Sequence, residues 1–354
     1  MKNILSKSTT LAFFLLALII AFNDSGFAQS PLKWRQAQHL DTGIQSSVVV
    51  LPSGLVVEFH RSENSNSKIW YRIGTVRQSF LGEYSVGWGK SQPIEYVGER
   101  PSVAITKEGY VVLVCTRFTY TGYKGTVMRY FAGQLNPAGD EKQTIQWRVK
   151  DALFDTGQFA KIVFNSNGVL VEVHESGHNS GLFYRIGHLA NPNQDDFTLV
   201  WDSTNGNNGV NYDNGANPTV SVNDQNQLIE SHQQRAGAGY IDYRRGTLGQ
   251  SSISFDSPGT TYDKDSNHPD VALTNNGVVV EAAATMGARF VKGVVVSRTG
   301  ILNSDPTFVN WSDSVDIGWD GWPGAEPSVA TDGTVAVAIW TGADKLFYAI
   351  APLQ

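Results

Sequence analysis

The sequence predicts an all-β fold, a six-bladed β-propeller whose blades each contain four strands. Three observations predict it: the composition, a unit that repeats along the chain, and a unit that is divided between the two ends. Of 354 residues, 41% are hydrophobic, 11% are aromatic and only 17% are charged, and 35 are glycine. This turn-rich, charge-poor composition favours many short strands over long helices, and it excludes a coiled coil or a disordered chain.

Residues 1–28 are predicted to be a secretory signal peptide. Lys2 and Lys7 precede an apolar run over residues 11–22, and small residues follow at 26–28, where a signal peptidase would cut. The run is too short to cross a hydrocarbon core, which needs roughly 20 apolar residues. We therefore expect residues 29–354 to form a single propeller domain that is secreted or periplasmic, from a bacterial cell, without membrane insertion.

The charge and the cysteine content exclude other classes of protein. A net charge of −6 argues against nucleic acid and anionic membranes as partners. The only cysteine, Cys115, lies in an apolar run, so it cannot form an internal disulfide and is expected to be a buried small hydrophobic residue.

The first half of the repeat predicts a hairpin. It consists of a short strand, a tight polar turn and a second strand rich in β-branched residues. The copies cover residues 47–61, 101–116, 160–175, 218–233, 269–284 and 327–341. Such self-similarity at a regular spacing is typical of a propeller or a solenoid.

Two further strands complete the unit. The third strand ends near a glycine in most copies, at residues 69–74, 129–133, 182–187, 241–246 and 346–350. The fourth carries a Trp or Phe, at residues 145–147, 199–201, 253–255 and 309–311. Four strands over roughly 50 to 60 residues match one propeller blade.

The two ends predict how the ring closes. Residues 32–34 and 40–43 match a fourth strand and its exit loop, but they precede the first full copy. The last copy stops after its third strand, at Gln354. We expect the N-terminal strand to join the C-terminal blade, which closes the ring and removes the exposed sheet edges.

Repeated polar and aromatic residues mark the candidate sites. The second strand ends in Glu-x-His in three copies, and a spacing of two places both side chains on one face of a strand. The third strand starts with Tyr-Arg, and the loop between blades carries an aromatic residue followed by Asp. The predicted ligand-binding residues are Glu58, His60, Tyr71 and Arg72; Glu172, His174, Tyr184 and Arg185; and Glu230, His232, Tyr243 and Arg244. The loop pairs are Phe154-Asp155, Tyr212-Asp213, Tyr262-Asp263 and Trp319-Asp320.

Two interpretations of this set remain open. Donors and acceptors around an aromatic ring suit the hydroxyl groups and apolar face of a sugar, and repetition would give multivalent avidity. Alternatively, each Glu and Arg form a buried pair that fixes the packing of neighbouring blades.

Metal binding is a further candidate. Asp263, Asp265 and Asn267 alternate oxygen donors as a calcium loop does, although the glycine and the downstream glutamate of an EF-hand are missing. Calcium is therefore a candidate cofactor. Zinc at the repeated histidines is disfavoured, because equivalent positions on different blades point apart.

One short motif raises the question of catalysis. Ser314, Asp316, Gly318 and Trp322 resemble the Ser-x-Asp-x-Gly-x-x-Trp box of the sialidase superfamily, with the Trp one residue later. A Gly-x-Ser-x-Gly elbow, a Walker loop and a Cys/His catalytic pattern are absent from the sequence. Whether the protein is an enzyme stays open, with a non-enzymatic role favoured and a glycoside hydrolase as the alternative.

The organisation of the whole chain resembles bacterial and fungal lectin-type propellers, particularly the six-bladed fucose-binding lectins. That resemblance implies sugars held between blades by Glu, Arg and an aromatic ring, here Glu58, Tyr71 and Arg72 and their copies. The sequence therefore predicts an exported, multivalent carbohydrate-binding protein whose partners are glycans. The alternatives are a sialidase-like hydrolase with an axial active site and a non-catalytic propeller that docks proteins.

Overall fold

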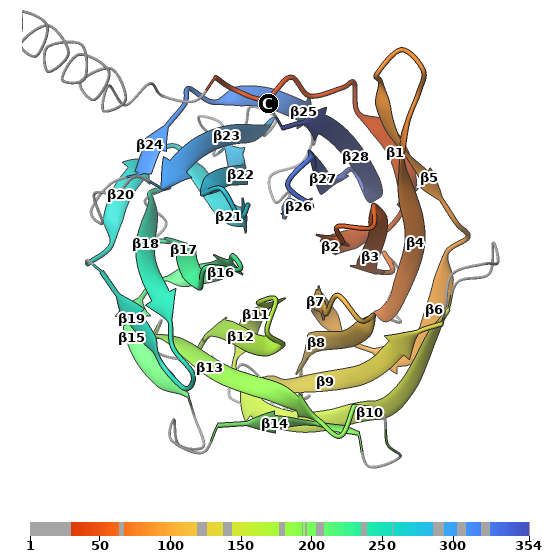
Figure 1. The fold of residues 1–354 in the computed structure, drawn as a ribbon, viewed down its shortest axis with the longest axis vertical. Coiled ribbons are helices and arrows are strands. Elements are labelled where there is room, and N and C mark those ends of the chain that lie inside the picture. Colours follow the sequence, from red (N-terminus) through yellow and green to blue (C-terminus); the bar gives the residue numbers. More distant parts are fainter. Residues whose placement is uncertain are drawn as a thin grey trace, which may run out of the picture.

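The computed structural model describes residues 30–63, 67–118, 126–136, 144–176, 181–192, 194, 197–202, 209–234, 239–256, 258–285, 294–302, 309–319 and 326–353. These residues form 28 strands in six antiparallel sheets, which surround a central axis like the blades of a propeller (Figure 1). The predicted all-β, six-bladed fold is confirmed. Within the described ranges, no helix is long and apolar enough to cross a membrane. The predicted signal peptide lies outside them.

The first three blades follow one another along the chain. Blade 1 contains β2 (Ile44–Val50), β3 (Leu55–Arg61), β4 (Lys68–Gln78), β5 (Tyr84–Trp88) and β6 (Gln92–Val97). Blade 2 contains β7 (Glu99–Ile105), β8 (Tyr110–Phe118), β9 (Thr126–Leu135) and β10 (Ile145–Thr156). Blade 3 contains β11 (Gln158–Phe164), β12 (Val169–Glu175), β13 (Gly181–Ala190), β14 (Thr198–Trp201) and β15 (Val210–Asn214).

The remaining blades complete the circle. Blade 4 contains β16 (Ala216–Val222), β17 (Gln227–Gln233), β18 (Ile241–Leu248), β19 (Ile253–Phe255) and β20 (Thr260–Asp263). Blade 5 contains β21 (Ser266–Leu273), β22 (Val278–Thr285), β23 (Val294–Leu302), β24 (Val309–Trp311) and β25 (Val315–Trp319). Blade 6 contains β26 (Ser328–Thr331), β27 (Val335–Gly342), β28 (Lys345–Pro352) and, from the other end of the chain, β1 (Gln38–Thr42).

Blade 6 closes the ring as the two ends of the sequence predict. Strand β1 pairs antiparallel with β28 and forms the outer edge of the last blade (Figure 1). Residues 32–34 differ from the prediction, because they precede β1 and lie outside any strand. Leu32 is buried in the apolar cluster that also contains Trp340, so this segment is held by packing rather than by a strand ladder.

The fourth strand is divided in four blades, and both parts pair with the third strand. The first part ends at an aromatic residue that lies opposite a glycine, as Trp88 lies opposite Gly74 and Trp201 opposite Gly187. A Cβ at Gly74 would come within 2.8 Å of the Trp88 ring. The glycine of the third strand therefore makes room for the ring of the fourth, which explains why both residues recur in the repeat.

The apolar clusters lie between neighbouring blades, and second strands contribute to each of them. One cluster joins Val112 of blade 2 to Leu170 of blade 3, and both side chains are fully buried. Cys115 is buried in the adjacent cluster, as expected, and burial raises the pKa of its thiol to about 12. A thiol that stays protonated at neutral pH is a poor nucleophile and metal ligand.

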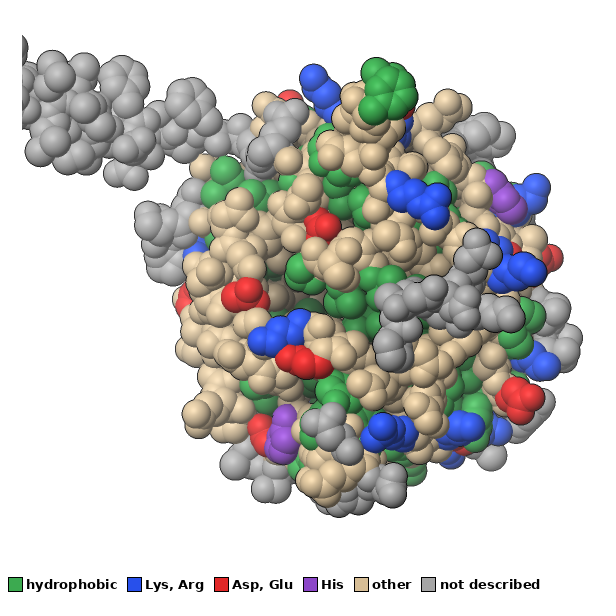
Figure 2. Space-filling model, turned by 45° about the vertical axis from the view of Figure 1, so that its right-hand side comes forward, with side chains coloured by type: hydrophobic (Ala, Val, Ile, Leu, Met, Phe, Trp, Pro, Cys, Tyr) green, Lys and Arg blue, Asp and Glu red, His purple; other side chains and the backbone are tan. Residues whose placement is uncertain are grey.

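Figure 2 shows acidic and basic side chains interspersed over the face in view, without a broad field of one sign.

Candidate functional site

The repeated Glu-x-His pair of blade 1 belongs to a charge network that joins two blades. The Nδ1 atom of His60 lies 3.0 Å from each carboxylate oxygen of Glu58, its neighbour on β3. Arg72, on β4, donates a 2.8 Å hydrogen bond from Nε to Asp41. Asp41 lies on β1, so it belongs to blade 6. The network therefore connects the last blade of the ring to the first.

The same network recurs where blade 2 meets blade 3 and where blade 3 meets blade 4. His174 and His232 each lie 3.1 Å from the carboxylate oxygens of Glu172 and Glu230. Arg185 donates to Asp155 of blade 2, and Arg244 contacts Asp213 of blade 3, each over 2.6 Å from Nε. In every case the aspartate comes from the preceding blade and the other three groups from the following one.

The two carboxylates determine the charge of each histidine. Burial by itself lowers the pKa of His60, His174 and His232, but the adjacent glutamate and the aspartate of the preceding blade more than offset it. The net effect raises each pKa, so the imidazolium form is favoured between the two anions.

The other three junctions replace parts of this network. Between blades 4 and 5, Ala283 stands where the histidine would be, and Arg298 contacts both Glu281 and Asp263. Tyr262 donates its hydroxyl to Glu281, and burial raises the pKa of Glu281 to about 7. Between blades 1 and 2 and between blades 5 and 6, the network positions themselves are apolar. Leu113, Cys115 and Phe131 occupy the Glu, His and Arg positions of blade 2, and Ala338, Trp340 and Ala349 those of blade 6.

The tyrosines of the predicted sites also connect blades. Tyr71, Tyr184 and Tyr243 are buried. Their hydroxyls accept hydrogen bonds from the first backbone N–H of the next blade's fourth strand, donated by Ile145, Ile253 and Val309. A hydroxyl at the end of a buried ring thereby positions the neighbouring blade.

This geometry supports the packing role for the repeated set. The three glutamates are 0% exposed and the three histidines at most 2% exposed, and the structure brings each Glu, His and Arg together as the repeat predicts. Their hydrogen-bonding atoms are turned toward one another rather than outward. A ligand-binding role for these twelve residues stays a prediction, and the contacts leave little of them for a ligand.

The candidate calcium loop is arranged differently from a metal site. Asp263 is buried and forms an ion pair with Arg298, while Asp265 is exposed. Across the described ranges, no three His, Cys, Asp or Glu side chains converge as metal ligands would. The Arg298 guanidinium already supplies a positive charge at Asp263, while Asn267 Oδ1 is buried without a hydrogen-bond partner among the described residues. Calcium binding at this loop stays a prediction.

The motif that resembles the sialidase box lies at β25. Gly318 packs against Trp340, and a Cβ at this glycine would overlap the indole ring. Trp322 and the loop residue Asp320 lie outside the described residues. The described part of the motif thus contributes to the contact between blades 5 and 6.

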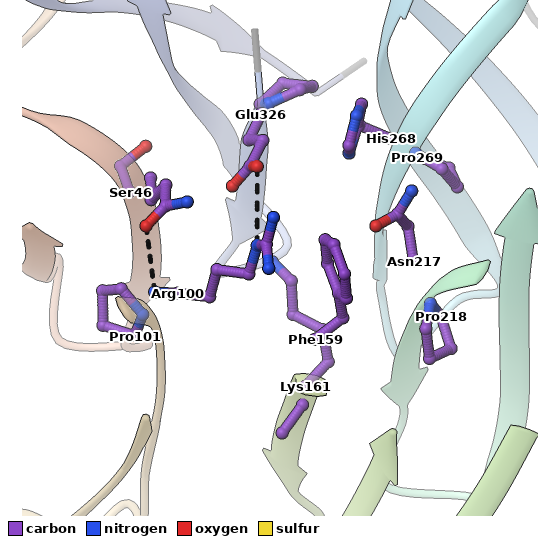
Figure 3. Close-up of a pocket in the computed structure, with 13 residues that line it drawn as sticks. Ser46, Arg100, Pro101, Phe159, Lys161, Asn217, Pro218, His268, Pro269 and Glu326 are labelled. Carbon is purple, nitrogen blue, oxygen red and sulfur yellow. Dashed lines mark hydrogen bonds and ion pairs between the residues drawn. The ribbon is translucent and has the colours of Figure 1, made fainter. Parts of the chain in front are cut away.

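A different site lies on the axis, where all six innermost strands begin (Figure 3). Each blade contributes the residues just before or at the start of its first strand. The pocket is lined by Gln45, Ser46, Arg100, Pro101, Phe159, Ala160, Lys161, Asn217, Pro218, His268, Pro269, Glu326 and Pro327. Its cavity volume is about 50 Å³. We call it the axial pocket.

Five blades present a non-glycine residue in the left-handed backbone region at this pocket. The φ values are 58° at Gln45, 51° at Arg100, 56° at Phe159, 50° at Asn217 and 48° at His268. In each of these blades the register of the first two strands shifts at this point, as in a β-bulge. Three of the residues also precede a proline, which further disfavours helical backbone angles. Such strain persists only where the surrounding structure imposes it, and bulges next to functional sites redirect side chains.

Charged and aromatic groups meet at the centre of the pocket. Figure 3 shows the Arg100 side chain between Glu326 and Phe159. The Arg100 guanidinium lies 3.5 Å from the centre of the Phe159 ring, and its Nε is 3.6 Å from Glu326 Oε1. The ring contact is a cation–π interaction, and the ion pair is too long for a good hydrogen bond.

Several polar atoms around the pocket remain available. Ser46 Oγ and Asn217 Oδ1 are buried and lack a hydrogen-bond partner among the described residues. Burial lowers the pKa of His268, and the Arg100 charge adds to this effect while Glu326 opposes it. The imidazole is therefore neutral at neutral pH, when it can both donate and accept a hydrogen bond. Buried polar atoms without partners are uncommon and call for a ligand or water.

An ion pair forms the floor of the pocket. Lys161 Nζ lies 3.3 Å from Asp270 Oδ1, between blades 3 and 5. Below this pair the axis continues as a channel of about 300 Å³, lined by the innermost strands of all six blades. Ser47, Ser102 and Ser328 stand at the same strand position as Lys161, and each accepts the backbone N–H of the next blade. Lys161 therefore differs from the serines at the equivalent positions, and its side chain extends across the axis to Asp270.

Sequence reasoning considered an axial site but missed its residues, because it searched for residues that recur. The charged, polar and aromatic residues of the pocket differ between otherwise similar copies, and five of them occupy one equivalent position at the start of the first strand. The available signal was this single variable position in an otherwise regular repeat.

No protein-family model and no curated protein matches this sequence. Solved structures share its fold at low identity. A protein of unknown function from Dyadobacter fermentans aligns with a TM-score of 0.59 and 11% identity, over 92% of this chain and all of its own. The parainfluenza virus 5 hemagglutinin-neuraminidase ectodomain gives 0.54 and 10%, over 100% and 96% of the two chains. A Hadza microbial sialidase gives 0.53 and 11%, over 88% and 66%. At 10–11% identity these similarities show a shared fold, the six-bladed β-propeller.

Proposed function

We propose that the axial pocket is the functional site and that the protein, after export, binds a carbohydrate there. The observation that carries the proposal is the ring of five strained, non-glycine residues, which differ in chemistry from blade to blade. If these five positions had only a structural role, glycine would be the more stable choice, because it adopts these backbone angles without steric cost. Strain retained by five blades around one opening favours a role for the side chains themselves.

The chemistry of the pocket suits a sugar. Amide, imidazole, guanidinium and carboxylate groups surround an aromatic ring, which is the combination that recognises hydroxyl groups and an apolar C–H face. A cavity of about 50 Å³ has room for roughly four water molecules. One substituent of a sugar would therefore enter the pocket while the ring lies across its opening. The viral and microbial proteins of similar fold, a hemagglutinin-neuraminidase and a sialidase, support a glycan as ligand.

This proposal replaces several sites at blade junctions with a single site on the axis. Multivalent binding through the repeated Glu, His, Tyr and Arg residues is supported less well, because these groups are paired and buried. A protein-docking role would not require strained residues around a small cavity.

Phe159→Gly tests the proposal. Glycine relieves the left-handed strain but removes the ring and the Arg100 contact, so the free energy of unfolding is expected to change by less than about 2 kcal/mol. Binding on an array of neutral and acidic glycans is expected to fall by at least about tenfold. Asn226→Gly is the matched control, because Asn226 also has a positive φ of 60° but lies in the turn between β16 and β17. If Phe159→Gly bound every glycan as the parent does, the axial site would be refuted.

Hydrolysis is the second candidate, and the carboxylates at the pocket favour it. Glycosidases use two carboxylates on either side of the bond that breaks. Glu326 lines the pocket, and Asp270 lies at its floor, where it is paired with Lys161 and accepts the backbone N–H of Val329. Turnover of nitrophenyl glycosides or a fluorogenic sialoside that is lost in Glu326→Gln would establish it. Binding without turnover of any of them would leave the protein a lectin.

A further inference from the structure

A second cavity lies at the junction of blades 6 and 1, away from the axis. It has a volume of about 380 Å³ and is lined by Asp41, Thr42, His60, Ser62, Glu63, Trp70 and Ser91. Trp70 stands on β4 directly opposite His60 of β3 and is partly exposed. We call this cavity the Trp70 groove.

The equivalent position between blades 2 and 3 is covered. Phe183 takes the place of Trp70, opposite His174. Its ring stacks on the imidazole, with centroids 5.6 Å apart and planes inclined by 13°. The side chain of the third strand thus covers the histidine of the network there.

Between blades 3 and 4 the position is closed by hydrogen bonds. Asp242 takes the place of Trp70, opposite His232. Gln234 donates from Nε2 to both Asp242 carboxylate oxygens, over 2.9 and 3.0 Å, and to Thr261 over 2.9 Å. The three charge networks are nearly identical, but they differ in the side chain that lies next to the histidine. At the junction of blades 6 and 1 that side chain is Trp70, and it borders an open cavity.

We propose that the Trp70 groove is a second binding site, for a neutral saccharide. The indole offers an apolar face for sugar C–H groups, and Thr42, Ser62 and Ser91 offer hydroxyls at its sides. Of the seven residues that line the groove, none is Arg or Lys, whereas Asp41 and Glu63 are acidic. The charge of His60 is balanced by Glu58. An acidic sugar would meet carboxylates without a free cation, so the groove selects against it, in contrast to the axial pocket with Arg100 and Lys161.

This inference takes the class of ligand from the proposed function, but its location is independent of the axial pocket. The test follows the Trp70 indole N–H by NMR in ¹⁵N-labelled protein, with the resonance assigned through Trp70→Phe. Mannose, galactose, N-acetylglucosamine and cellobiose are each added to about 50 mM, because one ring contact with a few hydrogen bonds gives millimolar affinity. Glucuronic acid and choline serve as the acidic and cationic probes.

We expect at least one neutral sugar to shift the Trp70 resonance saturably and the acidic sugar to leave it unchanged. Trp70→Ala, in which binding is followed through backbone amide resonances, should weaken that binding by at least about tenfold, whereas Phe183→Ala, the matched change at the covered junction, should leave it unaltered. A Trp70 resonance that no neutral sugar moves, or that only choline or glucuronic acid moves, would overturn the inference.

The two proposals fail separately. Persistence of the Trp70 shift in Phe159→Gly shows that the groove acts without the axial pocket. Glycan binding that depends on Phe159, together with a Trp70 resonance that does not shift, would refute the groove alone. A Trp70 shift combined with array binding that Phe159→Gly leaves intact would refute the axial site alone.

Discussion

Asp155→Ala is expected to lower the free energy of unfolding by about 3–5 kcal/mol, because it leaves a buried guanidinium without its anion. Asp155 and Arg185 are 3% and 6% exposed at their side chains, and Asp155 also lies near the imidazolium of His174. The substitution therefore removes one of the contacts between blade 2 and blade 3. The midpoint of urea unfolding at pH 7 measures the effect, provided that the slope of the transition stays constant.

The repeat supplies a matched control for this result. Asp41 makes the same contact with Arg72, but those side chains are 17% and 20% exposed. Water screens that pair and solvates the arginine once the partner is gone, so Asp41→Ala should cost only about 1–2 kcal/mol. Equal losses from the two substitutions would show that burial of the network does not determine its contribution.

Stability is expected to decrease as the pH rises from weakly acidic to alkaline. The pKa values of His60, His174 and His232 are raised above 6.5 in the folded protein. A raised pKa contributes stability that is complete below the unfolded value and is lost as the pH passes through the folded value. Glu281, whose pKa rises from 4.5 to about 7, acts with the same sign, and one pKa unit corresponds to about 1.4 kcal/mol.

At lower pH, stability is lost through groups whose pKa values are lowered in the folded protein: His268, whose contribution decreases below about pH 6.5, and two aspartates. The pKa values of Asp41 and Asp263 are lowered, through hydrogen bonds and the charges of Arg72 and Arg298 that outweigh burial. Their contribution is present above about pH 4 and is lost as the pH falls further. The melting temperature should therefore be highest at weakly acidic pH.

His174→Gln separates the contribution of one network. The difference in stability between the parent and this variant is expected to be larger at about pH 6 than at about pH 9, because only the parent has an imidazolium to lose. Thermal melts at the two values measure it. A difference that is independent of pH would mean that folding does not shift the pKa of His174.

Much of this molecule could be predicted from local pattern. The β-branched residues and short polar turns predict the hairpin of each blade. The repeat that is divided between the two ends of the chain predicts that β1 completes the blade of β28. The pairing of Glu58 with His60 also follows from a spacing of two along a strand, because side chains alternate between faces. These features depend on neighbours in the chain or on a unit that recurs, so the sequence alone determines them.

The tertiary structure decided what those residues do. Asp155 and Arg185 lie 30 positions apart and meet only because adjacent blades stack, so their burial could not be deduced from their spacing. The axial pocket depends on the ring even more strongly, since Arg100 and Glu326 come together only when six blades converge on one axis. A repeat shows which residues every blade shares, whereas convergence on the axis brings together the residues in which the blades differ.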